Sequence, residues 1–459
     1  MSANSPPDLG RVHLVGVGGA GMSAVAVLLA ARGLPVSGSD ARDSPVLAAL
    51  RDAGVRVHVG HAPGHVSGAD TVVVSTAVRP SNPELLRARE LGLRVLHRSE
   101  ALAWLMQGRR VVAVAGAHGK TTTSAMVTTV LRHAGRDPSY AIGGTFEGLI
   151  GAHHGSGAEF VAEADESDRS FLAYTPQIAV VTNVEPDHLD HYGSREAFEQ
   201  AFVDFTARIA PGGWLVACAD DAGSRTLAAA ARSAGVAVRS YGTAADADVV
   251  VGPWEPSADG GSVTVRDGDV VERVQLSVPG AHNGLNAAGA WAAARLVGVS
   301  AAEATAGLAT FVGAGRRFET RGRAGGVRVV DDYAHHPTEV AALLRAARQV
   351  AGEGRVLVLF QPHLFSRTAT FASEFADALS GADLVVVTDV YAAREDPDPA
   401  VTSALITDLM DPAKASFVPD GVTAATFLGR AARPGDLLLT VGAGDVTDLA
   451  PVVLGAVGS

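Results

Sequence analysis

The chain contains little cysteine and little lysine. Its 459 residues include one cysteine, Cys218, which excludes an internal disulfide and a cysteine-rich metal site. Lysine occurs twice, as Lys120 and Lys414, although lysine and arginine together number 37. A lysine kept in such an arginine-rich chain indicates a position where a compact ammonium suits the site better than a planar guanidinium, as in a phosphate cradle.

Long apolar runs and an excess of positive charge are also missing. No apolar run approaches the length of about 20 residues that crosses a membrane, and the start, MSANSPPDLGR, has no basic segment leading into an apolar core. The net charge of −12 argues against a nucleic-acid or membrane partner. We therefore expect a cytoplasmic protein. Its length predicts two or three domains, and 47% hydrophobic residues with 52 glycines are typical of an α/β fold.

Residues 110–123 read RVVAVAGAHGKTTT and predict a buried strand, a glycine turn and the start of a helix. In such a turn the backbone amides and the helix N-terminus face a polyphosphate, Lys120 adds charge, and a threonine hydroxyl can ligate Mg²⁺. The strict phosphate-loop pattern is not met, because Val114 stands where its first glycine would be. An ordinary strand-to-helix turn is the alternative.

A second glycine turn, Gly16–Gly21, reads GVGGAG between a predicted strand at 11–16 and a predicted helix at 22–32. This pattern favours a nucleotide diphosphate at the helix N-terminus. The next predicted strand, 35–39, ends at Asp40, where dinucleotide folds place an acid for a ribose hydroxyl, so an NAD enzyme stays open as an alternative.

Polar residues follow several other predicted strands. Ser75 ends a predicted strand at 71–75 and Thr76 follows it, and the acidic run 163–168 follows a strand at 159–162. The segment 183–191, after a strand at 178–182, holds two histidines and three acids. Carboxylates beside a phosphate loop are hard oxygen ligands for Mg²⁺, although a solvated acidic loop is the alternative. A glycine-rich connection is predicted before the acidic run, around Gly143 and Gly148.

The rest of the chain predicts a further alternation of strands and helices. His282, Asn283 and Asn286 begin a predicted helix, where they either pack or contact a nucleotide. Beyond residue 313, polar residues follow every predicted strand, which favours one working face of a third sheet. The fold class expected is α/β with three domains. These are a Rossmann-like N-terminal domain (1–108), a central P-loop-type ATPase domain with a mixed sheet (109–314) and a Rossmann-like C-terminal domain (315–459).

These patterns favour an ATP-driven joining reaction. No nucleophile and base of the serine-hydrolase kind stand together. A ligase instead converts a carboxylate to an acyl phosphate that an amine can attack, which requires positioning and charge neutralisation. A nucleotide-binding module without catalysis is a further alternative.

The chain resembles the Mur ligases over essentially its whole length. The start HLVGVGGAGMS and Arg316-Arg317-Phe318 are more particular to the family member that adds L-alanine, whereas the ATP loop and Asp-Tyr-Ala-His recur across the family. A sister ligase that recycles a muropeptide is the alternative within it. The matching segments are 13–23, 116–123, 163–171, 183–190 with Tyr192, 316–318, 331–340, 360–370 and 442–445.

The resemblance implies ATP and two Mg²⁺ ions, with Mn²⁺ tolerated. The implied small-molecule substrates are UDP-N-acetylmuramate and L-alanine, and the implied state is a monomer or weak homodimer. The implied catalytic residues are Lys120, Glu163 and His188, and the metal ligands are Thr121, Glu163 and His188. ATP contacts are implied for Gly116, Ala117, His118, Gly119, Lys120, Thr121, Thr122, His282, Asn283, Asn286, Arg317 and Asp332. Substrate contacts are implied for Gly18, Gly19, Ala20, Gly21, Asp40, Ser75, Thr76, His335, His336, His363 and Arg367.

The chain departs from the family pattern at a few positions. Ala117 replaces the usual threonine of the ATP loop, and Leu364 and Phe365 stand where an arginine and a tyrosine are expected. Arg394 replaces a common glycine. Several sister ligases position the second metal with a carbamylated lysine, but no lysine occurs between His188 and Arg316, so that device cannot operate in this chain.

Overall fold

The computed structural model describes residues 8–187, 189–258, 260–393 and 395–458. Contacts among them divide the chain into two compact units. The first unit comprises Met1–Gly252, Thr264–Val274 and Leu285–Thr310, and the second comprises Pro253–Val263, Gln275–Gly284 and Phe311–Ser459. The predicted domain boundaries at residues 108 and 314 stay predictions.

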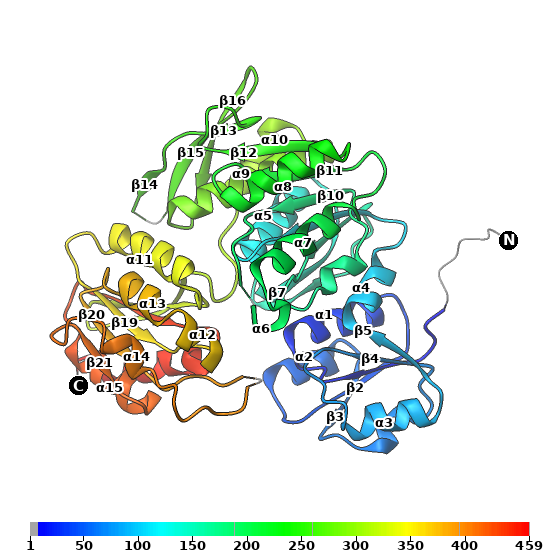
Figure 1. The fold of residues 1–459 in the computed structure, drawn as a ribbon, viewed down its shortest axis with the longest axis horizontal. Helices are drawn as coiled ribbons and strands as arrows, with labels where there is room; N and C mark the ends of the chain where they lie inside the picture. The colour runs from blue at the N-terminus through cyan, green and yellow to red at the C-terminus, as the bar shows by residue number, and fades with distance from the viewer. Residues whose placement is uncertain (1–7, 188, 259, 394, 459) are drawn as a thin grey trace. The chain divides into compact units, whose positions relative to one another are not determined.

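The N-terminal sheet is parallel, with the order β3-β2-β1-β4-β5 (Figure 1). Its strands are β1 (Val12–Val15), β2 (Val36–Asp40), β3 (Arg56–Val59), β4 (Thr71–Val74) and β5 (Arg94–His97). The chain moves outward from β1 in opposite directions to β2 and β4, so the carboxyl end of β1 is a topological switch point. Ligands bind at such points in open parallel sheets.

The N-terminal part of the first unit contains helices that follow its strands. They are α1 (Ala20–Ala31), α2 (Pro45–Asp52), α3 (Pro83–Glu90) and α4 (Arg98–Met106), with a 3₁₀ turn at Pro63–Val66. Helix α1 starts two residues earlier than predicted, because Gly19 serves as its N-cap. It packs on two strands of the middle sheet, β7 and β8, and one hydrophobic core runs through both parts. This shared core explains why contacts place the N-terminal sheet and most of the middle sheet in the first unit, whereas β14 belongs to the second.

The middle sheet has the order β14-β15-β13-β12-β11-β10-β6-β9-β7-β8, with β16 paired to β15 (Figure 1). Its first strands are β6 (Arg110–Ala115), β7 (Ser139–Phe146), β8 (Leu149–His153), β9 (Glu159–Glu163), β10 (Ile178–Val181) and β11 (Trp214–Cys218). The others are β12 (Ala237–Gly242), β13 (Val249–Val251), β14 (Glu255–Ser257), β15 (Gly260–Asp267) and β16 (Val270–Leu276). Strand β6 lies between β9 and β10, so the polar segments that follow these three strands meet at one edge.

The stretch around Gly143 and Gly148 is not the simple connection that the sequence predicts. It forms the antiparallel hairpin β7–β8, whose register shifts between Ala141 and Thr145. The glycines hid the strands because glycine is depleted in strands, although it marks bulges and close backbone approaches.

The helices of the middle part flank this sheet, and they are α5 (Lys120–His133), α6 (Leu189–Tyr192), α7 (Arg195–Thr206), α8 (Ala222–Ser233), α9 (Ala281–Leu296) and α10 (Ala301–Ala309). A 3₁₀ turn spans Ser170–Ala173. Helix α5 follows β6 through the predicted phosphate turn, and α10 packs against it.

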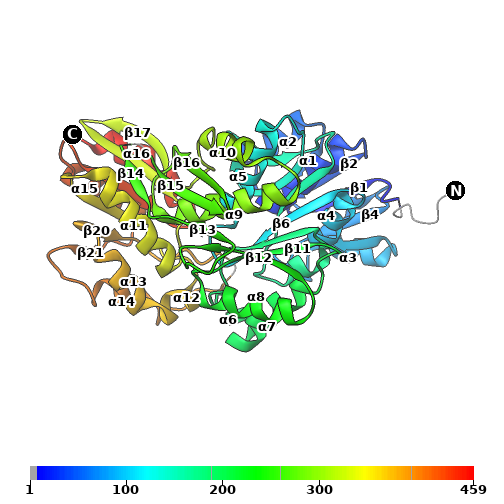
Figure 2. The ribbon, with the colours of Figure 1, turned by 90° about the horizontal axis from the view of Figure 1, so that it is seen from above.

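The C-terminal sheet has the order β17-β18-β22-β19-β20-β21, with β17 antiparallel and the others parallel. Figure 1 labels β19, β20 and β21 of this sheet, and Figure 2 labels β17. Its strands are β17 (Glu319–Ala324), β18 (Val327–Asp332), β19 (Val356–Phe360), β20 (Leu384–Val387), β21 (Ala415–Phe417) and β22 (Leu437–Val441). Its helices are α11 (Pro337–Ala351), α12 (Phe365–Thr370), α13 (Ala372–Leu379), α14 (Ala404–Thr407), α15 (Gly421–Ala431) and α16 (Ala450–Ala456), with a 3₁₀ turn at Asp445–Leu449. Separate apolar clusters fill the two faces, with α11 and α13 in one and α15 and α16 in the other.

The sheets and their helices confirm the predicted α/β class. No helix in the described part of the chain is both long enough and apolar enough to cross a membrane.

Candidate active site

The glycine turn after β1 forms one wall of a pocket of about 920 Å³. Helix α1 begins directly after the turn, so its first amides have no acceptor within the helix and can face an anion. Asp40, at the end of β2, accepts a hydrogen bond from the Gly18 amide at 2.8 Å. The residues of the predicted substrate site that line the pocket are Gly18, Gly19, Ala20, Gly21, Asp40 and Ser75.

Thr76, also predicted to bind substrate, is not among the described residues that line this pocket. Its hydroxyl donates to Asp168 Oδ2 at 3.0 Å. Sequence reasoning missed the basic side chains of the pocket, Arg42, Arg79 and Arg98. Arg42 and Arg79 follow the ends of β2 and β4, and this position after parallel strands is the signal that could have found them.

The second glycine turn connects β6 to α5 and depends on two glycines with positive φ. Gly116 has φ +134° and Gly119 has φ +82°. A Cβ atom at Gly116 would overlap Thr182 Oγ1, and one at Gly119 would lie 2.6 Å from Asn286 Oδ1. The turn thus begins at Gly116. Val114, which stands where the strict motif has its first glycine, is a fully buried strand residue.

Lys120 lies at the start of α5 with its ammonium folded back over the turn. Nζ donates to the carbonyl oxygens of Gly116 at 2.6 Å and Ala117 at 3.2 Å, and lies 2.9 Å from Glu166 Oε1. Burial would lower the pKa of Lys120, but the charges of Glu166 and Glu163 outweigh it and the pKa is raised. Lys120 is therefore a cation in this arrangement.

The first predicted metal ligands, Thr121 and Glu163, are brought together. Thr121 Oγ1 donates to Glu163 Oε2 at 2.9 Å, because β9 runs beside β6 with Glu163 opposite Val114. The Gly143 amide donates to the same oxygen at 2.8 Å, and a Cβ at Gly143 would lie 2.8 Å from it. The glycine of the missed hairpin thus lets its backbone approach the acid.

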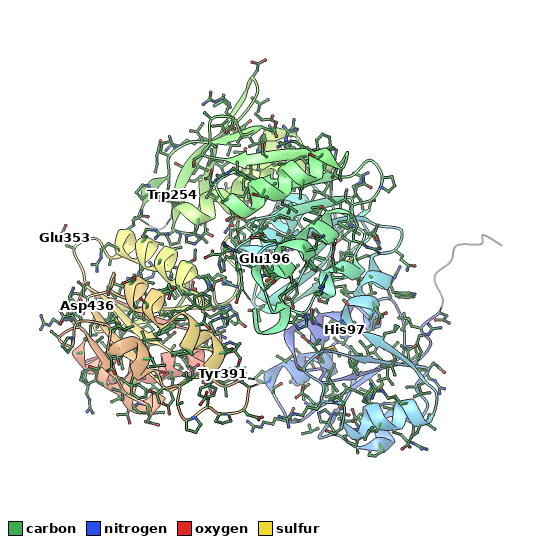
Figure 3. All side chains as sticks on the ribbon, in the orientation of Figure 1. His97, Glu196, Trp254, Glu353, Tyr391 and Asp436 are labelled. Carbon is green, nitrogen blue, oxygen red and sulfur yellow. The ribbon has the colours of Figure 1, made fainter. Side chains whose placement is uncertain are left out.

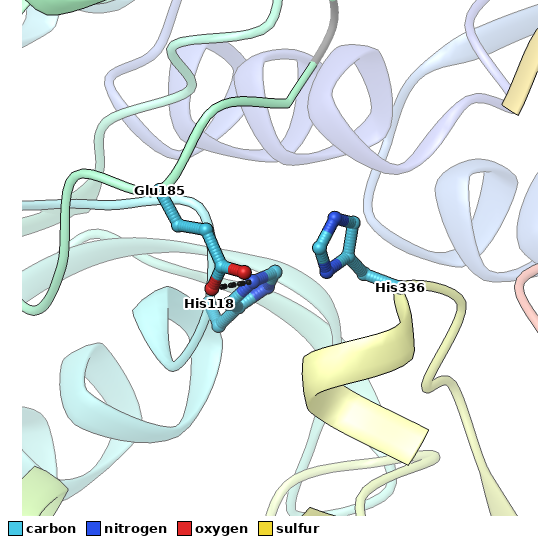
Figure 4. A group of neighbouring side chains, drawn as sticks. All are labelled: His118, Glu185 and His336. Atoms are coloured by element: carbon cyan, nitrogen blue, oxygen red, sulfur yellow. Dashed lines mark hydrogen bonds and ion pairs between the residues drawn. The ribbon is translucent and has the colours of Figure 1, made fainter. Parts of the chain in front are cut away.

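His118 is fixed by residues that follow β10. Its amide donates to Asn183 Oδ1 at 3.1 Å, and its carbonyl oxygen accepts from Asn183 Nδ2 at 3.0 Å. Its Nε2 lies 3.1 Å from Glu185 Oε2, as the dashed line in Figure 4 marks. The segment 183–191 therefore supports the phosphate turn. His188, the third predicted metal ligand, lies outside the described residues.

The side chains of the acidic run 163–168 contact two different parts of the first unit. Glu163 and Glu166 face the phosphate turn, whereas Asp165 and Asp168 face the N-terminal part. Arg98 donates to Asp165 Oδ2 at 2.6 Å, and His97, labelled in Figure 3, lies 3.8 Å from Asp168. This run is not the solvated loop of the alternative interpretation.

The start of α9 holds three predicted nucleotide contacts. Asn286 packs on Gly119 of the phosphate turn. Asn283 Nδ2 donates to the carbonyl oxygen of Pro279 at 2.7 Å, which fixes the turn before the helix. His282 is neutral, because burial lowers its pKa to about 4, with help from the charge of Arg345.

In the second unit, Asp332 stands at the end of β18 and organises the loop around it. It accepts hydrogen bonds from the amides of Phe318 and Ala334, each at 2.8 Å. Burial raises the pKa of Asp332 to about 6, against the charge of Arg317. Arg316 and Phe318 have positive φ without being glycine, a backbone strain that clusters at functional sites.

Other predicted residues of the second unit lie near one another. The rings of His335 and His363 are 6.0 Å apart, and Arg367 NH1 lies 3.4 Å from His363 Nδ1. His336 is buried and packs on Phe371. Leu364, one of the departures from the family pattern, is buried with φ +72°, and Arg394 lies outside the described residues.

Three family models match consecutive parts of the chain. They are "Mur ligase family, catalytic domain" at residues 11–110, "Mur ligase middle domain" at 114–294 and "Mur ligase, glutamate ligase domain" at 316–444. A UDP-N-acetylmuramate–L-alanine ligase from Kineococcus radiotolerans is 61% identical over 453 residues, which cover 97% of this chain and 96% of the relative. The chain belongs to the Mur ligase family.

Solved Mur ligase structures share the fold. The UDP-N-acetylmuramate–alanine ligase of Thermotoga maritima matches with a TM-score of 0.83 at 30% identity, covering 97% of this chain and 98% of that one. A murein peptide ligase from Psychrobacter arcticus matches with a TM-score of 0.73 at 26% identity, covering 98% and 99%. The three-domain α/β fold is confirmed. Mur ligases use ATP, so the NAD-enzyme interpretation of Gly16–Gly21 is set aside.

Proposed function

We propose that this chain joins L-alanine to the carboxylate of UDP-N-acetylmuramate at the expense of ATP, in the synthesis of the peptidoglycan precursor. The observation that carries the proposal is its 61% identity, over nearly the full length of both chains, to a relative named for this reaction. A second such relative, from Paenarthrobacter aurescens, is 55% identical over 98% of each chain.

ATP binds with its phosphates over the turn 116–119. The amides at the start of α5 and the ammonium of Lys120 face the β- and γ-phosphates. Lys120 exchanges its contact with Glu166 for the phosphate oxygens, since both are anions and the ammonium stays charged. Asn286 supports the turn from behind at Gly119.

The donor set beside this turn fits Mg²⁺. A threonine hydroxyl and a carboxylate 2.9 Å apart are hard oxygen ligands of the kind Mg²⁺ prefers. Thr121 and Glu163 would hold a first ion, and Glu163 with His188 would hold a second. Mg²⁺ bound by these residues would neutralise charge on the transferred phosphoryl group.

The reaction runs in two steps. A carboxylate oxygen of the muramoyl group attacks the γ-phosphorus, the bond to the β-phosphate oxygen breaks, and ADP leaves. The amine of L-alanine then attacks the acyl carbon, the amide bond forms, and inorganic phosphate leaves as the nitrogen loses a proton. Lys120 stabilises the charge that develops in the first step.

The pocket at Gly18–Gly21 holds the diphosphate of the nucleotide sugar, with Asp40 and Ser75 contacting the uridine and sugar. In the second unit, Arg317 and Asp332 contact ATP, and the polar group at 335, 336, 363 and 367 receives the amino acid and the muramoyl carboxylate. The enzyme works in the cytoplasm as a monomer or weak homodimer.

A phosphate-release assay with ATP, Mg²⁺ and UDP-N-acetylmuramate tests the proposal. Single amino acids are added in turn, and L-alanine is expected to give the fastest release. Release that does not depend on an added amino acid, or no release with L-alanine, would contradict the proposed reaction.

A second candidate is the recycling of a muropeptide, because a murein peptide ligase shares the fold at 26% identity. The same assay with a free tripeptide in place of L-alanine separates the two. A faster rate with the tripeptide would replace the first candidate with the second.

A further inference from the structure

Arg98 connects two sites of the first unit that the proposed reaction uses separately. It is the first residue of α4, and its side chain is mostly buried. One terminal nitrogen, NH2, donates to Asp165 Oδ2 at 2.6 Å and lies 3.8 Å from Asp168 Oδ2. This edge of the guanidinium therefore holds the acidic run of the middle part.

The other terminal nitrogen of Arg98 faces the pocket after β1. Arg98 lines that pocket, and its NH1 lies 3.0 Å from the place where a Cβ of Gly21 would stand. Gly21 belongs to the first turn of α1, whose amides face the same space. The missing side chain at Gly21 thus leaves NH1 beside the expected diphosphate position.

Asp165, which Arg98 contacts, lies in the same short run as two acids that contact the phosphate turn. Its neighbour in the chain, Glu166, lies 2.9 Å from the ammonium of Lys120, and Glu163 accepts from Thr121. The short run from Glu163 to Asp168 therefore carries contacts to the pocket on one side and to the phosphate turn on the other.

We propose that Arg98 is a positioning residue that couples the two nucleotide sites. It contacts the diphosphate through NH1 and keeps Asp165 through NH2, so a filled pocket orders the run 163–168 that supports Lys120. A guanidinium can do this because its donors form a rigid fork with two usable edges. Ordering this segment for one ligand lowers the cost of binding the other, so each ligand tightens the other. The inference rests on the proposed function, which assigns the pocket to a nucleotide sugar.

The test measures the dissociation constant of UDP by calorimetry, with and without a saturating non-hydrolysable ATP analogue and Mg²⁺. The wild-type protein is expected to bind UDP at least about five-fold tighter when the analogue is present. Arg98→Ala should weaken UDP binding about ten-fold, because a charged hydrogen bond is lost, and should bring the ratio of the two constants to one.

Two further variants separate coupling from simple loss of a contact. Asp165→Asn keeps Arg98 in the pocket, so UDP should bind within about three-fold of wild type while the ratio falls to one. Arg79→Ala removes another arginine of the same pocket that has no part in the acidic run, so UDP should bind more weakly with the wild-type ratio retained. Arg98→Lys tests the fork itself, because an ammonium offers one charged point and should restore affinity without restoring the ratio.

The outcomes are distinguishable. A wild-type protein that fails to bind UDP overturns the proposed function and this inference with it. A wild-type protein that binds UDP with a ratio of one overturns the inference alone. The inference is likewise overturned if Arg98→Ala, Arg98→Lys or Asp165→Asn keeps the ratio, or if Arg79→Ala loses it. Thermal unfolding of each variant verifies that it is folded, and the conservative variants decide between the outcomes if Arg98→Ala is not.

Discussion

The two glycine turns of the first unit share a local plan and differ in their electrostatics. Gly16–Gly21 and Gly116–Gly119 each follow a central parallel strand and precede a helix. In the first turn a carboxylate, Asp40, binds a turn amide, and no residue of the turn carries a charge. In the second, Lys120 begins the helix and contacts a buried acid, Glu166.

Two buried glutamates of the first unit, Glu84 and Glu166, also differ in their electrostatics. Glu84 accepts hydrogen bonds from Ser39 and His65 and lies 3.4 Å from His13. Burial would raise the pKa of Glu84, but these partners lower it to about 2. Burial raises the pKa of Glu166 to about 7, against the charge of Lys120.

Under the proposed function, we expect the first turn to bind the nucleotide sugar and the second to take part in turnover. A fully bonded carboxylate such as Glu84 is fixed in place, because moving it would leave buried partners unsatisfied. Glu166 instead contacts the ammonium of Lys120, which can exchange this contact for a phosphate oxygen. Four predictions, from the largest expected effect to the smallest, test this distinction.

The largest effect is expected for Lys120→Ala. Loss of the ammonium should lower turnover about a thousandfold, because one charged donor to a transferred group contributes that much, and UDP binding should change little. Phosphate release and UDP calorimetry measure the two effects. Lys414→Ala, which removes the other, exposed lysine, is the matched control and should keep full turnover. Normal phosphate release by Lys120→Ala would contradict the catalytic role of the second turn.

Glu163→Ala should reduce turnover about a hundredfold while UDP binds as in wild type. Thr121 remains as a partial ligand, so part of the activity should return at higher Mg²⁺ concentration. Phosphate release titrated with Mg²⁺ measures this, with Glu163→Gln as the variant of equal size. A loss that no concentration of Mg²⁺ relieves, together with weaker UDP binding, would instead indicate a damaged fold.

A pair of glycine substitutions should divide the ligands between the turns. Gly119→Ala places a Cβ 2.6 Å from Asn286 Oδ1 at φ +82°, and should raise the KM for ATP about ten-fold. Gly18→Ala places a Cβ 2.9 Å from Asp40 Oδ2. It should weaken the binding of UDP to a similar degree and leave the KM for ATP unchanged.

The control for this pair is Gly33→Ala, since Gly33 has φ +83° and a Cβ there would meet nothing within 4 Å. It should cost about 1 kcal/mol of stability and affect neither ligand. If Gly119→Ala and Gly18→Ala each affected both ligands alike, the two turns would not bind different ligands.

The smallest effect on activity is expected for Glu84→Gln, which should act on stability. Because the pKa of Glu84 lies below its ordinary value of 4.5, the ionised group stabilises the fold above that pH. This contribution, about 3 kcal/mol, is lost as the pH falls from 4.5 towards 2. Denaturant unfolding from pH 7 to pH 3 should show a steeper loss for wild type than for the variant. Parallel curves would show that Glu84 does not titrate in this way.

Much of the framework could be predicted from local sequence. Short apolar runs such as 356–360 and 437–441 form strands, because buried parallel strands are continuous apolar segments. The two glycine turns were found because each is contiguous in sequence. Thr121 and Glu163, 42 residues apart, were joined by the resemblance to the Mur ligases.

The rest depends on strand order, which no local pattern encodes. Arg98 and Asp165 are 67 residues apart and meet because α4 and the end of β9 lie together in the first unit. The pairing of His118 with Glu185 likewise needs β10 beside β6. Asp165 and Asp168 are identical in type to metal-ligating acids, so sequence could not show that they bind the N-terminal part instead.

Because Lys120 is buried, its chemical labelling can report how often the phosphate turn opens. Lys414 is exposed, whereas Lys120 is covered by its own turn and by Glu166. An amine-reactive reagent therefore meets one freely accessible lysine and one that is shielded. The ratio of label at the two positions, read by mass spectrometry, reports how often the turn opens, with the accessible lysine serving as an internal standard within each molecule.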